Sequence, residues 1–137
     1  MKTILLADDE DSLRTLVYTT LEDSGFQILE ASDGDEALSL ARAHRPDLLV
    51  LDWMMPGLTG VEVTAALRKE DPSGQTPIIL LTAKSQQDDI AAALKTGVTS
   101  YLLKPFSPAE LLTVVESLLA GTPAASTAEG VCQNAQL

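Results

Sequence analysis

Residues 47–57 read DLLVLDWMMPG, and this stretch decides the fold because it joins a short apolar run to an aspartate and a turn. Short continuous apolar runs are typical of strands that are buried on both faces of a parallel sheet. Here the run Leu48–Leu51 ends at Asp52, and Pro56 and Gly57 follow as turn residues. We therefore expect a buried strand with Asp52 at its carboxyl end.

Three other apolar runs also end in polar side chains. Ile4–Ala7 precedes Asp8 and Asp9, Ile78–Leu81 precedes Thr82, and Tyr101–Leu103 precedes Lys104. Because parallel strands end at one edge of their sheet, these side chains and Asp52 should crowd that edge. Three carboxylates held so close repel one another, and folding alone does not require such a cluster. A divalent cation between them is the simplest explanation.

Strand-like segments alternate with helical segments along the chain. The strands are expected at 2–7, 27–31, 47–51, 77–81 and 100–103. The helices are expected near 11–24, 34–44, 60–69, 86–96 and 108–120. This alternation predicts an α/β fold in which a parallel sheet is covered by helices on both faces.

Several residues mark where the helices begin and end. Asp33 and Glu36 have the spacing of a capping box, and Asp11 is expected to cap the first helix. Gly25 and Gly97 lie where helices should stop. Pro46 and Pro108 fit a helix exit and a first helical turn. Two apolar stripes are expected to pack in the core: Leu13, Leu16, Val17 and Leu21, and Leu111, Val115, Leu118 and Leu119.

The chain carries a formal net charge of −11, and its charged residues are unevenly distributed. Residues 1–83 hold 6 basic and 15 acidic side chains, whereas residues 84–120 hold 3 and 4. An acidic surface repels nucleic acid and anionic membranes and favours cations or basic protein surfaces. We therefore expect this chain to bind neither nucleic acid nor membrane.

The length and the cysteine content limit the class of protein further. A chain of 137 residues can form one domain with a tail and bury a core without disulfides. The single cysteine, Cys132, excludes an internal disulfide and offers no zinc-binding set. No apolar stretch approaches the length of a membrane span, so a cytoplasmic protein is expected.

The side chains at the strand ends suit phosphoryl transfer. A carboxylate can act as nucleophile and carry an acyl phosphate. A divalent metal and a lysine ammonium neutralise the phosphoryl oxygens, and a threonine hydroxyl can donate to one of them. Asp52, Lys104 and Thr82 fit these roles.

With these residues the chain resembles the response-regulator receiver domains of two-component signalling. The resemblance rests on Asp8-Asp9, on Asp52-Trp53-Met54-Met55-Pro56-Gly57 with Gly60, on Leu81-Thr82-Ala83, and on Tyr101-Leu102-Leu103-Lys104-Pro105-Phe106. It covers residues 1 to about 120 and implies a doubly wound (βα)5, flavodoxin-like sheet of five parallel strands in the order 2-1-3-4-5. Residues 121–137 are expected to be a flexible tail or the start of a linker. Both a single-domain regulator and the front of a longer one fit.

The resemblance assigns a metal site and a phosphoacceptor. It implies that Mg²⁺ is held by Asp8, Asp9, Asp52 and the backbone carbonyl of Met54. It makes Asp52 the residue that accepts a phosphoryl group from a sensor histidine kinase or a phosphotransfer protein. The chain would catalyse only its own phosphorylation and dephosphorylation, and so it would not be a turnover enzyme.

The resemblance also implies a switch. Lys104, in a cis Lys104–Pro105 peptide, and Thr82 would contact the phosphoryl group. Thr82 would then move and let the Tyr101 ring turn inward, which changes the face made by the fourth helix, the fifth strand and the fifth helix. An unknown downstream protein would read that face. The fifth helix lacks the arginine that the winged-helix subfamily uses in its dimer contact, which puts that dimer in doubt.

Three other functions compete with this interpretation. Aspartate-nucleophile phosphatases need a second acid two residues after the nucleophile, and this chain has Met54 there. A flavodoxin-like electron carrier needs a phosphate-binding first loop, which Asp8–Asp11 would repel. A pseudo-receiver that only binds a partner usually loses part of the acid, lysine and threonine set, whereas this chain has all of it. His44, the single histidine, is expected on the surface.

Overall fold

The structure is a computed structural model that describes residues 2–70, 76–83 and 87–120. Five strands alternate with five helices in it. The strands are β1 (Thr3–Ala7), β2 (Gln27–Ala31), β3 (Leu48–Asp52), β4 (Ile78–Thr82) and β5 (Ser100–Leu103). The helices are α1 (Asp11–Asp23), α2 (Gly34–His44), α3 (Gly60–Glu70), α4 (Gln87–Thr96) and α5 (Pro108–Leu119).

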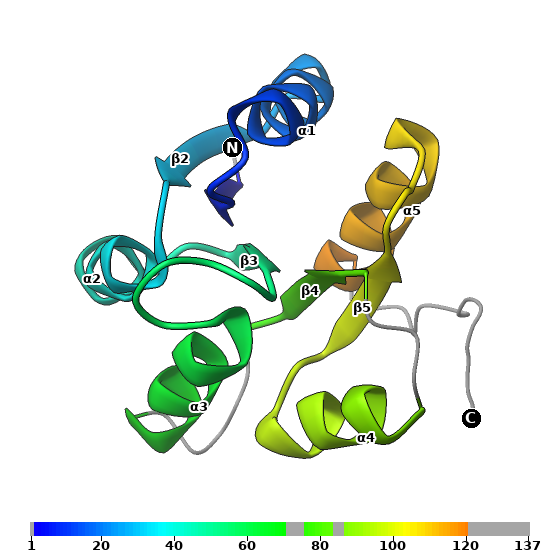
Figure 1. Cartoon of the computed structure of the whole chain (residues 1–137). Helices are drawn as coiled ribbons and strands as arrows, with labels where there is room; N and C mark the ends of the chain where they lie inside the picture. The colour runs from blue at the N-terminus through cyan, green and yellow to red at the C-terminus, as the bar shows by residue number, and fades with distance from the viewer. Residues whose placement is uncertain (1, 71–75, 84–86, 121–137) are drawn as a thin grey trace.

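The strands form one parallel sheet in the order β2-β1-β3-β4-β5. Figure 1 shows α1 and α5 on one face of this sheet and α2, α3 and α4 on the other. Both the alternating α/β class and the strand order implied by the family resemblance are therefore confirmed. The flexible tail or linker start expected at 121–137, which contains Cys132, lies outside the described residues.

Two apolar layers hold the helices to the sheet, because successive strand residues point to opposite faces. Ile4 and Leu6 of β1 pack with residues of α1 and α5, whereas Leu5 and Ala7 pack with residues of α2, α3 and α4. Every residue of the central strands β3 and β4 is buried. This double burial explains why those strands read as uninterrupted apolar runs.

The helix ends agree only in part with the predictions. Gly25 and Gly97 end α1 and α4 with φ angles of +93° and +119°, as expected for glycine stops. The expectation that Asp11 caps α1 is wrong, because Glu10 is the N-cap residue and Asp11 is already helical. At α2, Asp33 accepts from the N–H of Glu36, but the Glu36 carboxylate accepts from the N–H of Ser32. The capping box is therefore incomplete there.

A complete capping box is present at α5, where the sequence pattern predicted only a proline in the first turn. Ser107 accepts from the N–H of Glu110 at 3.1 Å, and Glu110 accepts from the N–H of Ser107 at 2.9 Å. The core stripes also need one correction: Leu16 is 43% exposed, because it lies beside a groove at the edge of α1 and not over the sheet. None of the described helices is both long and apolar enough to span a membrane.

Candidate functional site

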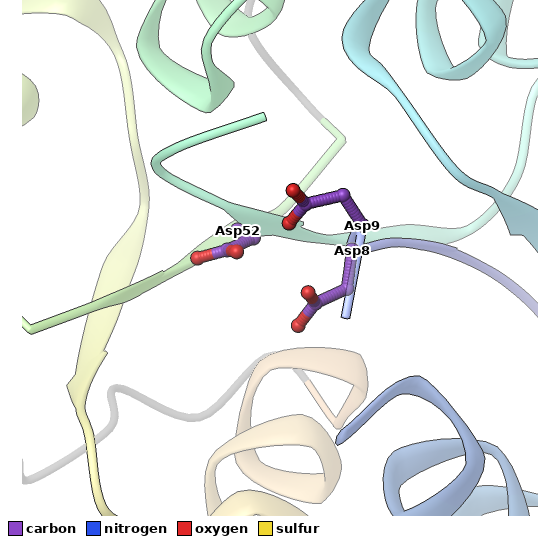
Figure 2. A group of neighbouring side chains, drawn as sticks. All are labelled: Asp8, Asp9 and Asp52. Atoms are coloured by element: carbon purple, nitrogen blue, oxygen red, sulfur yellow. The ribbon is translucent and has the colours of Figure 1, made fainter. Parts of the chain in front are cut away.

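The register of the sheet brings the predicted acidic residues together. Ala7 of β1 pairs with Leu51 of β3, so the residues that follow these two, Asp8 and Asp52, lie side by side at the carboxyl ends of the two strands. Asp9 comes next in the chain. Figure 2 shows the three carboxyl groups gathered at the ends of β1 and β3, and one oxygen of each lies within 4.8 Å of the others.

Asp8 is the most constrained of the three acids. It is fully buried, its N–H donates to the carbonyl of Ala31 at 3.2 Å, and its Oδ1 accepts from the N–H of Glu10 at 2.9 Å. Burial raises the pKa of Asp8 from 3.8 to about 6, and the negative charge of Asp52 acts in the same direction. Both the hydrogen bond from Glu10 and the charge of Lys104 act against this rise in pKa.

The second oxygen of Asp8 indicates what the cluster can hold. Among the described residues, Oδ2 of Asp8 is a buried side-chain oxygen without a hydrogen-bond partner. Leaving a buried acceptor without a partner is unfavourable, and a cation would satisfy it. The possible metal-ligand atoms of Asp8, Asp9 and Asp52 are all carboxylate oxygens, which is the ligand type that Mg²⁺ prefers. The residues therefore fit a divalent metal site.

Lys104 supplies the positive charge beside this cluster. Its Nζ donates to Oδ1 of Asp52 at 2.9 Å, and the two side chains are only 23% and 8% exposed. Its backbone N–H donates to the carbonyl of Thr82 at 2.8 Å, which fixes the end of β5 against β4. The Lys104–Pro105 peptide is cis, as the resemblance implied.

The loop that follows Asp52 is folded tightly over the strand end. The N–H of Trp53 donates to the carbonyl of Leu81 at 2.8 Å, and the carbonyl of Trp53 accepts from the N–H of Gly60 at 2.9 Å. Only glycine fits at position 60, because an added Cβ would lie 2.5 Å from the carbonyl oxygen of Asp52. Within the described segments, the carbonyl of Met54 accepts no hydrogen bond, and Met54 is 62% exposed. The predicted metal-ligand role of this carbonyl is thus compatible with the loop but remains a prediction.

Gly34, which was not predicted as a site residue, supports this loop. The N–H of Gly34, the first residue of α2, donates to the carbonyl of Pro56 at 3.2 Å. A Cβ on Gly34 would lie 1.9 Å from the carbonyl oxygen of Leu58, so the loop could not rest on α2 if another residue stood there. The sequence Asp33-Gly34 signalled a helix start and not this close approach.

Thr82 and Tyr101, the predicted switch pair, lie on neighbouring strands. Thr82 is 2% exposed at the end of β4, and Tyr101 is half-buried on β5 and packs against the core layer beneath α2, α3 and α4. Tyr101 pairs with Leu80, two residues before Thr82, so the two side chains point to the same face of the sheet. Their coupled movement remains a prediction. His44 is exposed, as expected.

The acidic site lies beside a groove. The groove has a volume of about 520 Å³ and is lined by Glu10, Ser12, Leu13, Leu16, Lys104, Pro105 and Phe106.

An arginine that was not predicted as a site residue contacts the acidic site. Arg14, in the first turn of α1, donates from Nη1 to the backbone carbonyl of Asp8 at 2.7 Å. The only sequence signal for Arg14 was its position three residues after Asp11, with which it forms an ion pair.

Transcriptional regulators are among the known proteins with similar sequences. The chain is 39% identical over 121 residues to the phosphate regulon transcriptional regulatory protein PhoB of Pseudomonas aeruginosa, and the match covers 88% of this chain and 53% of that protein. It is 45% identical over 118 residues to the alkaline phosphatase synthesis transcriptional regulatory protein PhoP of Bacillus subtilis, with 86% and 48% covered. The chain thus spans about half the length of these relatives.

Solved structures and a family model agree with this similarity. The receiver domain of the Francisella response regulator 1452 superposes with a TM-score of 0.83 at 36% identity, covering 88% of this chain and 98% of that one. The chemotaxis protein CheY4 of Vibrio cholerae gives a TM-score of 0.80 at 36% identity, covering 86% and 98%. The model of the response regulator receiver domain matches residues 4–116. The chain therefore belongs to the family of response regulator receiver domains.

Proposed function

We propose that Asp52 is the phosphoacceptor of this receiver domain and that a phosphohistidine on a sensor kinase or phosphotransfer protein is the donor. The observation that carries the proposal is the ion pair between Lys104 Nζ and Asp52 Oδ1 at 2.9 Å, placed beside two further carboxylates. A nucleophilic carboxylate oxygen of Asp52 attacks phosphorus, the phosphorus–nitrogen bond of the donor breaks, and its electron pair stays on the imidazole.

The residues around Asp52 have distinct tasks in this proposal. Asp8, Asp9, Asp52 and the carbonyl of Met54 would hold Mg²⁺. When bound, the ion neutralises charge on the phosphoryl oxygens. Lys104 provides a second positive charge at the same position, and because it is mostly buried its interaction with the oxygens is weakly screened.

The donor is proposed to approach over the groove beside Lys104. The groove has an apolar side, made by Leu13 and Leu16 of α1 and Phe106, and it reaches the ammonium group that contacts Asp52. An apolar helix of a donor protein can pack there and bring its phosphohistidine in line with Asp52. This domain is proposed not to bind nucleic acid itself, because residues 1–83 carry 15 acidic and 6 basic side chains. The expected cytoplasmic location remains a prediction.

Output is proposed to pass through the face made by α4, β5 and α5. A phosphoryl group adds about −1.5 to −2 charges and three strong acceptors at Asp52. Thr82 would donate to one of these oxygens, and the Tyr101 ring would move inward in response. Leu94 and Leu103 leave apolar surface exposed at this face, at 44% and 41%, which an unknown downstream protein can cover.

The phosphoacceptor assignment is tested by intact mass after incubation with acetyl phosphate and Mg²⁺. The wild-type protein and the control variant Asp23→Asn, altered at an exposed acid at the end of α1, should each gain one phosphoryl group. The variant Asp52→Asn should gain none. A phosphoryl adduct of equal yield on Asp52→Asn would exclude Asp52 as the acceptor.

The output route needs a separate test. Binding of a downstream partner should strengthen when beryllofluoride, a phosphoryl mimic, is added to the wild-type protein. The variant Tyr101→Ala should lose most of this increase while still binding beryllofluoride, because the ring and not the acidic site is removed. An equal increase in both proteins would argue against the Tyr101 route.

A further inference from the structure

Arg14 connects three parts of the molecule at the edge of the acidic site. Its Nη1 donates to the backbone carbonyl of Asp8 at 2.7 Å. Its Nη2 contacts Oδ1 of Asp11 at 2.6 Å, and its Nε lies 3.3 Å from Oε1 of Glu30 on β2. The Arg14 side chain is 19% exposed, whereas those of Asp11 and Glu30 are 87% and 44% exposed. The contact with Asp8 is therefore the one most protected from water.

This contact completes the fixation of Asp8. The Asp8 N–H is held by Ala31 and the Oδ1 atom by the N–H of Glu10, so Arg14 fixes the remaining backbone group. Among the described residues, only Oδ2 of Asp8 is left without a partner. Asp8 forms the acidic cluster together with Asp9 and Asp52. The protein thus holds every polar atom of Asp8 except the one that a cation would take.

We propose that Arg14 is a positioning residue of the metal site, which holds the turn Asp8–Glu10 in its binding geometry before Mg²⁺ arrives. The inference rests on the proposed function of the acidic site. Arg14 belongs to α1 and its carbonyl partner belongs to the end of β1, so the guanidinium fixes the two ends of a turn that contains two of the three acids. Without it, repulsion among the acids would favour a wider spacing.

The planar guanidinium is needed for this task, and its charge alone does not suffice. Its fork directs separate N–H groups toward a carbonyl and two carboxylates on different elements at once. A lysine at this position keeps the charge but offers no rigid fork. The variants Arg14→Lys and Arg14→Met should therefore both loosen the site, and a similar effect of the two distinguishes positioning from simple charge compensation.

The test compares the binding of two cations by calorimetry. Mg²⁺ requires near-octahedral geometry, whereas Ca²⁺ accepts irregular and larger sites. Substitution of a residue that orients a metal ligand typically lowers metal affinity by about tenfold or more. We expect Arg14→Lys and Arg14→Met to weaken Mg²⁺ binding by about tenfold and Ca²⁺ binding by less than about threefold. General destabilisation of the fold would instead weaken the binding of both cations equally.

Two further measurements make the result decisive. Arg42→Met is the matched control, because Arg42 forms an exposed ion pair with Glu70 between α2 and α3, and it should leave the affinities for both cations unchanged. In the metal-free protein, hydrogen exchange at the Glu10 amide should be faster in the Arg14 variants than in the wild type, because the turn opens more often. If an Arg14 variant fails to fold, Glu30→Ala removes a residue that orients the guanidinium and should shift the Mg²⁺ to Ca²⁺ preference in the same direction.

The outcomes separate this inference from the proposed function. If the wild type binds Mg²⁺, Asp9→Ala abolishes binding, and the Arg14 variants keep the wild-type preference for Mg²⁺, the role of Arg14 is refuted and the metal site stands. If Arg14→Lys alone behaves like the wild type, charge and not positioning is responsible, and the inference fails. If the wild type and Asp9→Ala bind Mg²⁺ equally, the acidic site itself is refuted, and the role of Arg14 with it.

Discussion

The substitution Asp8→Asn should make the metal-free protein more stable at neutral pH. Asp8 is fully buried, its Oδ2 has no hydrogen-bond partner in the described part of the chain, and burial raises its pKa from 3.8 to about 6. An acid with a higher pKa in the folded state binds its proton more tightly there than in the unfolded chain. The stability that this proton provides is present below about pH 4 and is lost as the pH rises to about 6.

The size of the effect follows from the same two pKa values. A rise in the pKa of Asp8 from 3.8 to about 6 corresponds to about 3 kcal/mol. Above about pH 6 Asp8 is charged in the folded protein, and the free energy of unfolding is lower by this amount than it would be with Asp8 protonated. An asparagine has nearly the same shape, carries no charge, and can donate from its amide to Asp52. The variant should therefore be more stable than the wild type by up to about 3 kcal/mol near pH 7.5, and about equally stable near pH 4.

Urea unfolding in the presence of EDTA measures this difference at both pH values. Asp23→Asn, at an exposed acid, is the control and should not show the same dependence on pH. Mg²⁺ should then raise the unfolding free energy of the wild type, because only the folded state holds the ligands together, and should raise that of Asp8→Asn far less. An Asp8→Asn protein no more stable than the wild type near pH 7.5, or a gain that is equal at both pH values, would refute the reasoning.

Four further substitutions test other parts of the site and fold. Lys104→Met removes the ammonium group 2.9 Å from Asp52 and should slow phosphorylation by acetyl phosphate about a hundredfold. The rate is measured as the time course of intact mass, and an unchanged rate would show that Lys104 has no role in the reaction. Gly60→Ala places a Cβ 2.5 Å from the Asp52 carbonyl oxygen and should cost about 2–3 kcal/mol in urea unfolding. Gly25→Ala, which meets nothing within 4 Å and is strained only by its left-handed backbone, should cost about 1 kcal/mol, and equal losses would contradict the predicted clash at Gly60. Ser107→Ala breaks the capping box of α5 and should lower stability by about 1 kcal/mol without changing Mg²⁺ affinity; altered affinity would show that the cap acts on the site.

The sequence predicted the elements well because the strands are buried on both faces. Continuous apolar runs placed β3 and β4 within one residue of their observed bounds, Leu48–Asp52 and Ile78–Thr82. The strand order has no such local signal, since apolar periodicity does not encode which strands are neighbours. It was available only through the resemblance to receiver domains, which the observed order confirms.

The acidic cluster could be predicted from the positions of Asp8 and Asp52 at the ends of buried strands. The contacts that hold the cluster in place could not be predicted. Asp8 and Asp52 each follow a buried run, and parallel strands end at one edge, so their approach follows from the fold class. The contacts of Arg14 with Asp8 and of Gly34 with the loop after Asp52 depend on how α1 and α2 are placed in space. Local patterns also failed for Asp11 and Leu16, where the helix start and the width of the buried face were set by neighbouring elements.

Chemical trapping at position 52 tests the central claim most directly. Borohydride reduces an acyl phosphate but leaves a free carboxylate unchanged, so it marks the phosphorylated residue. After treatment with acetyl phosphate and Mg²⁺, peptide mapping should find the reduced side chain at Asp52 and at no other acid, and omission of Mg²⁺ or replacement of Asp9 by alanine should abolish it. A reduced side chain at Asp8 or Asp9 instead, or labelling of Asp52 that does not depend on Mg²⁺, would contradict the proposed mechanism.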